Sequence, residues 1–385
     1  MSTAQIYQLA TTERKQQNRF RELRSLATTG GAEISLDGDR KLINFASNDY
    51  LGLTKHHELK KRAIEFTEKY GVGLGSSRLV SGNLNVFEKL ERKVAQFKGS
   101  KTALLLPSGY QTNATVLAAL GRKRTLLASD HENHNSITTG IQLTQGEWQR
   151  YSHNDLGHLE TLLRKSPDST KWIVSESVFS MDGDVSDVSA LSHLATKYDA
   201  AVYIDEAHAT GVLGAEGRGL CYDANGVDIA MGTFSKAFGS FGAYIACSNE
   251  MRHYLINFCA GLIYSTALPP PLLGAIDAAL DLIPSMNEER ARLLDKSETL
   301  RDQLNKLGFS TGNSKTQIIP IIVGTDAEAL SLARYLEECA ILAPAIRPPT
   351  VRDGEARVRV SLTAVHTDDH IEHLLSSLKR WKASG

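Results

Sequence analysis

The chain has 385 residues, of which 42% are hydrophobic and 23% are charged, an ordinary globular composition that excludes a disordered tail, a collagen-like repeat and a disulfide-dense miniature. Its 43 lysines and arginines against 44 aspartates and glutamates give a net charge of −1, so charge gives no reason to expect nucleic acid or a membrane as a partner. Four cysteines without zinc-type spacing, no leader pattern and no apolar stretch of about 18 residues predict a cytoplasmic protein without a metal or a membrane span.

Helix and strand patterns alternate along most of the chain. A basic helix and a short strand at 42–45 are expected in the first segment. Apolar residues at helical spacing predict a helix over 84–97, and Gly99 stands where a glycine would end it. Six short apolar runs follow, at 102–106, 125–128, 172–174, 201–204, 229–233 and 243–247. Runs without polar alternation predict strands buried on both faces of a mostly parallel sheet, so the expected fold class is α/β.

The pattern changes after the three prolines at 269–271. The elements expected there are a helix at 272–307, a strand at 317–323, a helix at 327–338, a strand at 356–362 and a final helix around 371–381. In the strand at 356–362, alternation predicts that Val358 and Val360 face a core while Arg357 and Arg359 face away. The predicted organisation is an N-terminal segment at 1–45, a large α/β domain at 46–275 and a smaller C-terminal α/β domain at 276–385.

Polar residues follow three of the predicted strands, which is where ligands bind in open α/β sheets. Asp205 and His208 follow one apolar run, and Lys236 follows the next. The turn Ser108–Tyr110 follows a third run and opens a helix, whose free N–H groups suit a phosphate. A helix-capping aspartate, a solvated lysine and a plain turn are the ordinary alternatives. Together, however, an amine, a carboxylate and a phosphate cradle are what pyridoxal phosphate requires.

Other motifs in the chain fail on their spacing. The glycines at 71–75 follow a helical pattern and lack the G-x-G-x-x-G order of a dinucleotide site. The histidines in the run 131–134 are three apart, not in the H-E-x-x-H arrangement that binds zinc. Ser108 lacks the G-x-S-x-G elbow of serine hydrolases. We therefore expect no nicotinamide site, no catalytic metal and no serine nucleophile.

Seven longer motifs, several of which contain these residues, resemble those of a known family. The chain resembles the α-oxoamine synthases, which are fold-type I pyridoxal-phosphate enzymes, from Asn44 to His366. The motifs that carry the resemblance are NFASNDYLGL (44–53), GSSRLVSGN (75–83), LPSGYQTN (106–113), SESVFSMDGD (175–184), YIDEAHATGVLGAEGRG (203–219), TFSKAFGSFG (233–242) and IYSTALPP (263–270). The resemblance implies the aspartate aminotransferase-like fold, with a large, mostly parallel sheet domain, and a homodimer whose active sites lie at the subunit interface.

The resemblance also implies roles for residues around the cofactor. Lys236 would form the Schiff base and later take the substrate Cα proton. Asp205 would pair with the pyridinium nitrogen, and His208 would hydrogen-bond the phenolic oxygen. The remaining cofactor contacts implied are His134 stacked on the ring, Gly109, Tyr110, Ser180 and Thr233 around the ring edge and phosphate, and Ser265 and Thr266 reaching the phosphate of the neighbouring subunit.

The substrate side follows from the same resemblance. Asn48 and Arg347 would hold the amino-acid carboxylate. His134 and Thr350 would make further contacts with substrate. Arg21 matches the N-terminal substrate arginine of the family, with Arg24 as the alternative.

The C-terminal motifs at 345–351 and 356–366 look most like those of the members that act in biotin synthesis. These members condense L-alanine with pimeloyl-CoA or pimeloyl-acyl carrier protein and release CO2 and the thiol carrier. Another α-oxoamine synthase, such as a glycine C-acetyltransferase, is the alternative within the family. A non-catalytic scaffold subunit of the same fold is the alternative of another class, although such subunits lack the lysine that stands here at 236.

Overall fold

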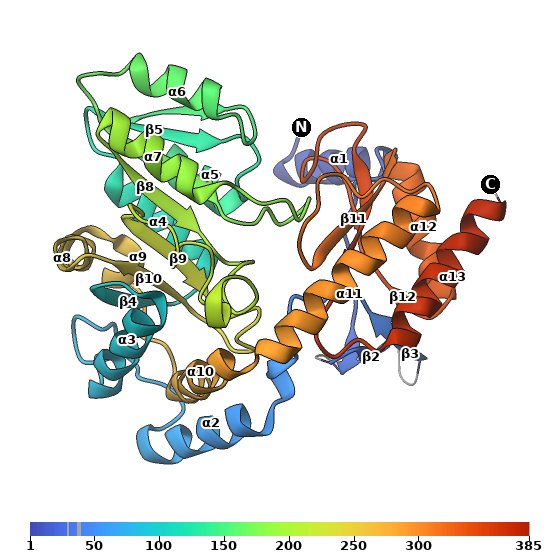
Figure 1. Ribbon diagram of the computed structural model, residues 1–385, viewed down its shortest axis with the longest axis horizontal. Coiled ribbons are helices and arrows are strands. Elements are labelled where there is room, and N and C mark those ends of the chain that lie inside the picture. Colours follow the sequence, from blue (N-terminus) through green and yellow to red (C-terminus); the bar gives the residue numbers. More distant parts are fainter. Residues whose placement is uncertain (29–30, 37–39, 385) are drawn as a thin grey trace. The chain divides into compact units, whose positions relative to one another are not determined.

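The computed structural model describes residues 1–28, 31–36 and 40–384, and contacts divide the chain into two compact units (Figure 1). Unit 1 comprises Met1–Asn48, Met181–Gly183 and Arg292–Gly385, and unit 2 comprises Asp49–Ser180 and Asp184–Ala291. The N-terminal residues therefore group with the C-terminal part of the chain, whereas the sequence pattern alone treated them as a separate segment.

Unit 2 is built on a seven-stranded sheet with the order β4-β10-β9-β8-β7-β5-β6. Neighbouring strands are parallel except around β10, which is antiparallel to both of its neighbours. In chain order the strands are β4 (Thr102–Leu106), β5 (Thr125–Asp130), β6 (Glu147–Tyr151), β7 (Thr170–Glu176), β8 (Ala200–Asp205), β9 (Ile229–Thr233) and β10 (Ala243–Cys247). All residues of β5, β9 and β10 are buried, as in strands covered on both faces. The predicted α/β class is confirmed.

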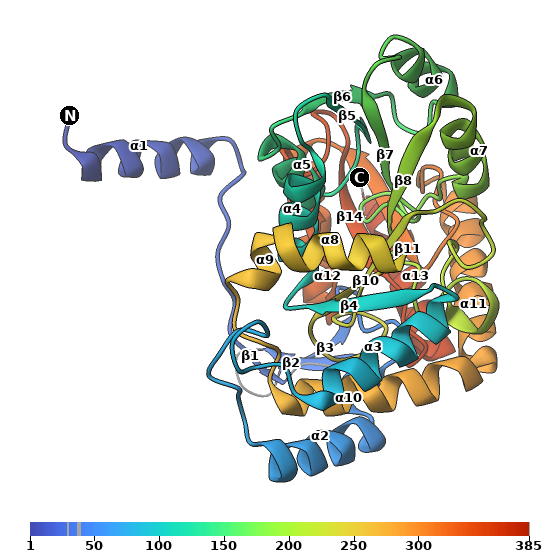
Figure 2. The ribbon, with the colours of Figure 1, turned by 90° about the vertical axis from the view of Figure 1, so that its left-hand side faces the viewer.

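Helices cover both faces of this sheet (Figure 2). On one face α4, α5, α8 and α9 pack against strand residues such as Leu106, Val174 and Met231 to form a core. On the other face α3, α6 and α7 contact the strands. The helices of unit 2 are α2 (His57–Tyr70), α3 (Asn85–Lys98), α4 (Gly109–Leu120), α5 (Asn135–Gln142), α6 (Leu156–Arg164), α7 (Val188–Tyr198), α8 (Asn249–Phe258), α9 (Ala260–Ile263) and α10 (Pro270–Leu282), with short 3-10 turns η1 (Leu53–Lys55), η2 (Ala215–Gly217) and η3 (Ile283–Ser285).

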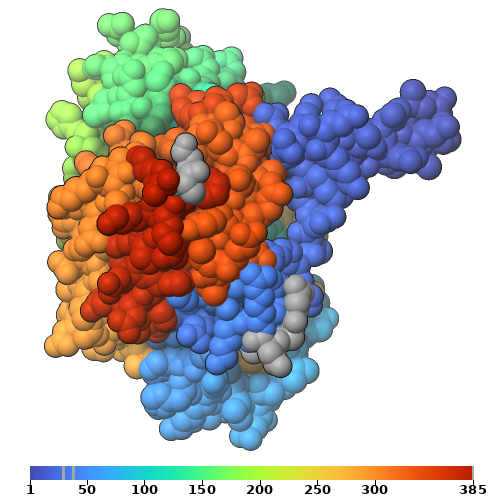
Figure 3. Space-filling view, turned by 90° about the vertical axis from the view of Figure 1, so that its right-hand side faces the viewer, coloured from blue at the N-terminus to red at the C-terminus, as the bar shows by residue number. Residues whose placement is uncertain are grey.

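Unit 1 contains two smaller sheets, with the orders β1-β2-β3-β12 and β11-β14-β13. Their strands are β1 (Leu26–Thr28), β2 (Glu33–Leu36), β3 (Arg40–Asn44), β11 (Ile318–Gly324), β12 (Ile341–Leu342), β13 (Ala345–Ile346) and β14 (Ala356–Ser361). The helices are α1 (Thr3–Gln16), most of α11 (Asn287–Lys306), α12 (Asp326–Glu338) and α13 (Asp368–Ser384). Figure 3 shows α13 on the surface of this unit, beside α11 and α12.

Two expectations for the C-terminal part are wrong. The helix expected over 272–307 is two helices, α10 and α11, because Pro284 lies in the turn η3 and a proline cannot continue the helical hydrogen-bond pattern. In β14, Arg357 and Arg359 do not face solvent but are buried. Arg357 pairs with the carboxylate of Asp182, and both terminal nitrogens of Arg359 lie 3.3 Å from Oδ1 of Asn48, so each buried cation has polar partners inside unit 1.

Within residues 1–28, 31–36 and 40–384, no helix is both long and apolar enough to cross a bilayer. The same ranges contain no group of three or more His, Cys, Asp or Glu side chains that could hold a metal ion. The four cysteines are free, and Cys221, Cys247 and Cys259 are buried.

Candidate active site

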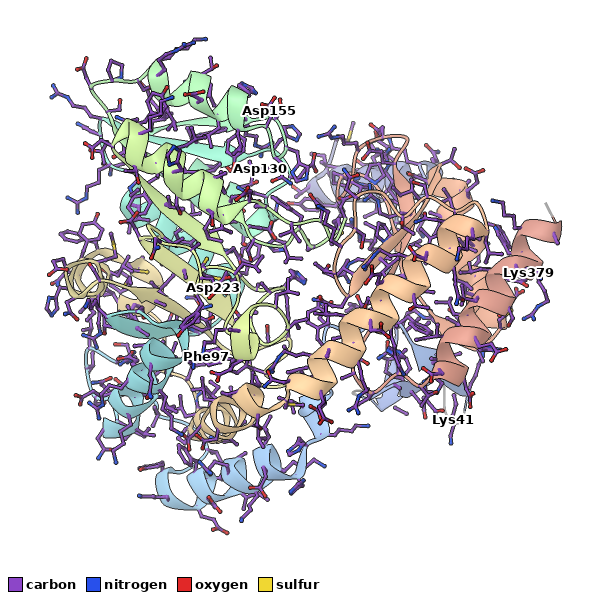
Figure 4. The ribbon with its side chains drawn as sticks, viewed as in Figure 1. Lys41, Phe97, Asp130, Asp155, Asp223 and Lys379 are labelled. Carbon is purple, nitrogen blue, oxygen red and sulfur yellow. The ribbon has the colours of Figure 1, made fainter. Side chains whose placement is uncertain are left out.

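The carboxyl ends of the parallel strands of unit 2 bring together the residues singled out by the sequence. Asp205 ends β8 and Thr233 ends β9, while Asp130 ends β5 (Figure 4). Leu106, at the end of β4, and Thr233 pair with the same residue of β10, Ala243, so the turn after β4 starts level with the end of β9. This edge is where an open α/β sheet binds its ligand.

Lys236 lies in the loop after β9 and contacts a histidine from the loop after β8. Its Nζ is 2.8 Å from Nε2 of His208, and Nδ1 of His208 is 2.6 Å from the hydroxyl of Tyr50. Lys236 is partly buried, while His208 and Tyr50 are buried. Two residues predicted to act on one ligand are therefore neighbours, and Tyr50 is a third that the sequence analysis did not single out.

The first turn of α4 forms a cradle beside Thr233. Ser108 caps the helix by accepting the N–H of Gln111, so the N–H groups of Gly109 and Tyr110 are the first-turn donors without an intrahelical partner. A Cβ on Gly109 would lie 3.3 Å from Met231 and 3.6 Å from Thr233, so glycine allows the turn to approach the end of β9. Free N–H groups at a helix start beside a threonine suit a phosphate.

Asp205 is a buried carboxylate held by two donors. Its Oδ2 accepts a hydrogen bond from Nδ2 of Asn113 at 2.7 Å, and its Oδ1 accepts from the backbone N–H of Ala207 at 2.8 Å. Glu176 lies directly opposite on β7 and is also buried. Burial, together with the negative charge of Asp205, raises the pKa of Glu176 well above its ordinary value. Glu176 therefore releases its proton less readily than an ordinary glutamate.

A second carboxylate beside Asp205 is neutralised by an ion pair. Glu206, the next residue along the chain, lies 2.5 Å from the Nζ of Lys98, and both side chains are almost fully buried. The backbone N–H of Cys221 donates to the other oxygen of Glu206 at 2.9 Å. This ion pair leaves Asp205 as the buried anion available to a cationic ligand atom.

His134 caps α5 and lies beside Tyr110. Its ring centroid is 6.4 Å from that of Tyr110, with the planes 81° apart, and the Tyr110 hydroxyl contacts Asn135 and Thr139 at 3.0 Å. Burial lowers the pKa of His134, and the charge of Lys236 adds to this while that of Asp205 opposes it. His134 is therefore mainly neutral at pH 7.

The other expected cofactor contacts are less closely tied to this cluster. Ser180 is buried in the loop after β7. Ser265 accepts a hydrogen bond from Nε2 of Gln111 at 2.5 Å, so in its own subunit it lies beside the start of α4. Thr266 is exposed and forms an isolated β-bridge with Ser77.

Apart from His134, the expected substrate residues lie in unit 1. Arg21, Arg347 and Thr350 line a cavity of about 290 Å³, together with Arg19, Ala345, Ile346 and Pro348. Arg21 donates from Nη2 to the hydroxyl of Thr350 at 3.1 Å, and Arg347 donates to the backbone carbonyl of Asn18. Burial lowers the pKa of Arg347.

The two alternative arginines differ in their surroundings. Arg24 makes a two-pronged ion pair with Glu337, at 2.6 and 2.9 Å, and does not line the cavity that Arg21 lines. Asn48 is held instead by Arg359, a residue that the alternating strand pattern had placed away from the core. Of the two arginines, Arg21 lines the cavity and Arg24 is paired with Glu337.

The set of residues fits pyridoxal phosphate. An amine, a buried carboxylate and a helix start occupy one edge of one sheet, and the glycine at 109 lets the helix start lie close to Thr233. Asn113, Ser136 and Glu176 belong to the same cluster but were missed by the sequence analysis. Asn113 and Glu176 stand inside motifs that carried the family resemblance, but nothing in the sequence shows that they touch Asp205 or its neighbours.

Comparisons with known proteins agree with this geometry. Residues 40–378 match the family model described as aminotransferase class I and II. An 8-amino-7-oxononanoate synthase of Gluconacetobacter diazotrophicus is 48% identical over 383 residues, covering 97% of this chain and 96% of that protein. A putative 8-amino-7-oxononanoate synthase of Desulfosudis oleivorans is 47% identical over 385 residues, covering 99% of this chain and 100% of that protein.

Solved structures show the same fold. A serine palmitoyltransferase of Sphingomonas wittichii superposes with a TM-score of 0.92 at 26% identity, covering 99% of this chain and 98% of that one. An 8-amino-7-oxononanoate synthase of Francisella tularensis gives a TM-score of 0.78 at 28% identity, covering 89% of this chain and 98% of that one. The fold-type I architecture expected from the motifs is confirmed.

Proposed function

The chain belongs to the aminotransferase class I and II family, and on that premise we propose that it is a pyridoxal-phosphate-dependent acyltransferase that makes 8-amino-7-oxononanoate from L-alanine and a pimeloyl thioester. CO2 and the free thiol carrier are the other products. The observation that carries the proposal is the 48% identity to a synthase of that name over 97% of this chain. The reaction belongs to biotin biosynthesis, and a cytoplasmic location stays a prediction.

Residues of unit 2 would hold the cofactor. Lys236 Nζ provides the amine for its aldehyde, and Asp205 keeps a proton on its ring nitrogen. The N–H groups of Gly109 and Tyr110, with Thr233, bind the phosphate, while His134 covers the ring. When bound, pyridoxal phosphate supplies a cationic ring that accepts the electrons of a bond broken at the substrate Cα.

Lys236 has the central part in proton transfer. With pyridoxal phosphate and alanine bound, Nζ would take the Cα proton of alanine and return a proton later in the reaction. His208, 2.8 Å from Nζ, orients the amine, and Tyr50 fixes His208 from its other side. The raised pKa of Glu176 disfavours its anion, and the charge of Glu206 is balanced by Lys98, so neither carboxylate competes with Asp205 for a cation.

Residues of unit 1 would recognise the substrates. Arg347 and Asn48 hold the alanine carboxylate, for which a guanidinium offers two parallel donors. Arg21 and Thr350 contact substrate from the arginine-lined cavity, whose positive charge suits an anionic donor such as a pimeloyl thioester.

A homodimer is part of the proposal, with Ser265 and Thr266 reaching the phosphate bound by the partner subunit. Thr266 pairs with Ser77, so the segments 76–80 and 264–267 run side by side. Three large apolar side chains on these segments are strongly exposed: Leu79 by 52%, Val80 by 81% and Tyr264 by 83%. Exposed apolar residues of this kind mark surfaces that are covered by a partner.

A product assay tests the function. The cofactor-loaded protein is incubated with L-alanine and either pimeloyl-CoA or pimeloyl-acyl carrier protein, and the products are identified by mass spectrometry. We expect 8-amino-7-oxononanoate with at least one carrier. In light scattering, the protein should have twice the 42.1 kDa mass of one subunit. Faster product formation from glycine and acetyl-CoA would contradict the substrate assignment. Absence of any product with a normal cofactor spectrum would contradict the reaction itself.

A further inference from the structure

A chain of buried hydrogen bonds connects Asp205 with His134. At its centre is Asn113 on α4, a side chain that is only 1% exposed. Nδ2 of Asn113 lies 2.7 Å from Oδ2 of Asp205 and 2.9 Å from Oγ of Ser136. Oγ of Ser136 is 2.8 Å from Nδ1 of His134. The other end of the amide, Oδ1, lies 2.6 Å from the hydroxyl of Tyr203.

The chemistry of the end groups fixes the orientation of the amide. An ionised carboxylate only accepts hydrogen bonds, so the atom of Asn113 that faces Asp205 is the NH2 nitrogen. The Tyr203 hydroxyl then donates to the amide oxygen. Burial and the charge of Asp205 raise the pKa of Tyr203 well above its ordinary value, so this phenol keeps its proton.

Counting protons along the chain determines the state of the histidine. Both amide protons of Asn113 are used, one on Asp205 and one on Ser136. The backbone N–H of Ser136 donates to Nδ1 of His134 at 3.2 Å, so this nitrogen is an acceptor. The hydroxyl of Ser136 then donates its proton to the same nitrogen across the 2.8 Å contact. A ring nitrogen that accepts two donors carries no proton.

We propose that Asn113 and Ser136 are positioning residues that hold the carboxylate of Asp205 and fix His134 as a neutral imidazole protonated on Nε2. The amide of Asn113 thereby positions both Asp205, proposed to pair with the ring nitrogen of the cofactor, and His134, proposed to stack on its ring. The Nε2–H has no partner among the described residues, so it is a donor available to a substrate oxygen. His134 is then unable to take the substrate proton through Nδ1, which leaves that step to Lys236.

Nitrogen-15 NMR of the imidazoles tests the first part of this proposal, and it needs neither cofactor nor turnover. The full chain is labelled at its histidine nitrogens, and the His134 signals are identified by their loss in His134→Gln. We expect Nδ1 to show the shift of an unprotonated nitrogen and Nε2 that of a protonated one, at about pH 7. A protonated Nδ1 in the unchanged protein would overturn the proposal.

Variants of Ser136 test which residue fixes the proton. Ser136→Ala removes the hydroxyl donor, so the two His134 shifts should move toward each other as the other tautomer and the imidazolium gain population. Ser136→Thr keeps a hydroxyl and should restore the separation. Ser192→Ala is the matched control, because it deletes an equally buried hydroxyl that has no hydrogen-bond partner in the described part of the chain. Unchanged shifts in Ser136→Ala would overturn the proposal.

Cofactor affinity tests the other end of the chain. Asn113→Asp is almost isosteric but places a second carboxylate against Asp205, so the pair shares a proton and the hold on a cationic ring nitrogen weakens. We expect the dissociation constant of pyridoxal phosphate to rise about 10- to 100-fold, the range for losing one hydrogen bond to a charged group. Unchanged affinity in a folded Asn113→Asp protein would overturn this part.

The inference rests on the proposed function only for the substrate-facing role of Nε2–H. If the NMR and affinity results are as expected but no 8-amino-7-oxononanoate forms, the proposed reaction fails and the positioning role stands. If product forms but Nδ1 is protonated, the positioning role fails and the reaction stands.

Discussion

The two units hold their functional residues in different ways. In unit 2, Asp205 at the end of β8 and His208 in the loop after it are buried, and each is hydrogen-bonded to a side chain of the same cluster, Asn113 and Tyr50 respectively. In unit 1, Arg21 and Arg347 line an open cavity and are joined by contacts between chain segments more than 300 residues apart. The residues proposed for chemistry therefore lie at the edge of a buried sheet, whereas those proposed for recognition lie on loops, which tolerate change more readily.

Removal of the Lys236 amine from unit 2 is expected to reduce activity more than any other change. Lys236→Ala should abolish product formation, because both the covalent link to the cofactor and the proton transfer depend on Nζ. The imine absorbance of the loaded protein should disappear as well. Lys101→Ala, an exposed lysine of unit 2, is the control and should retain activity. Substantial turnover in Lys236→Ala would show that another group carries the reaction.

Two variants compare the roles of the neighbouring carboxyl groups of Asp205 and Glu176. Asp205→Asn should lower kcat by about 100- to 1,000-fold, the loss typical of removing one electrostatic partner of the reacting system. Glu176→Gln should change kcat by less than about threefold, because the raised pKa of Glu176 favours its neutral form and the amide oxygen of glutamine still accepts the N–H of His134. Steady-state kinetics measures both. Equal losses would show that Glu176 is ionised in the active protein.

Arginine variants in unit 1 should affect binding more than chemistry. Arg21→Ala should raise the KM for the acyl donor by about tenfold, with a smaller change in kcat, since a charge-assisted contact to substrate is lost. Arg24→Ala should leave KM almost unchanged, because that side chain pairs with Glu337 at an exposed site. The reverse result would assign the substrate contact to Arg24.

The smallest expected effects are opposite pH trends in the two units. In unit 2, burial acts to lower the pKa of His153, but hydrogen bonds to Asp130 and Asp184 raise it to about 10. Its contribution to stability is therefore complete below about pH 6.5 and is lost as the pH rises through 10. In unit 1, burial lowers the pKa of His366 to about 4. Its contribution is complete above about pH 6.5 and is lost as the pH falls through 4.

Urea unfolding across pH 5 to about pH 9 checks these signs. The difference in free energy of unfolding between the unchanged protein and His153→Gln should become smaller as the pH rises. The same difference for His366→Gln should become smaller as the pH falls. Parallel trends for the two variants would show that the environments of the two histidines are not the ones described.

The sequence indicated the candidate site residues themselves, but not the residues that hold them in place. Asp205, Lys236 and the turn at Gly109 were recognisable because each follows an apolar run, and strand ends meet at one edge of a parallel sheet. Asn113 and Glu176 were missed because their roles depend on which strand lies beside which, and single-sequence patterns do not give lateral order. The choice between Arg21 and Arg24 stayed open for the same reason, since only the fold places Glu337 against Arg24.

Two errors show how burial depends on distant segments. Alternation in β14 predicted that Arg357 and Arg359 face away from a core, as on a one-sided sheet. Both are buried because Asp182 and Asn48, from far earlier in the chain, supply polar partners. The broken helix after residue 282 was readable in principle, since Pro284 marks the interruption.

The shared amide of Asn113 has a consequence for how this site can change over time. Because the same NH2 group serves Asp205 and Ser136, a substitution at either neighbour alters the fit of the other. Double-mutant cycles between Ser136 and Asp205 should therefore show strong non-additivity, although these two side chains interact through Asn113. Position 113 is therefore expected to stay an asparagine for as long as both neighbours depend on its NH2 group.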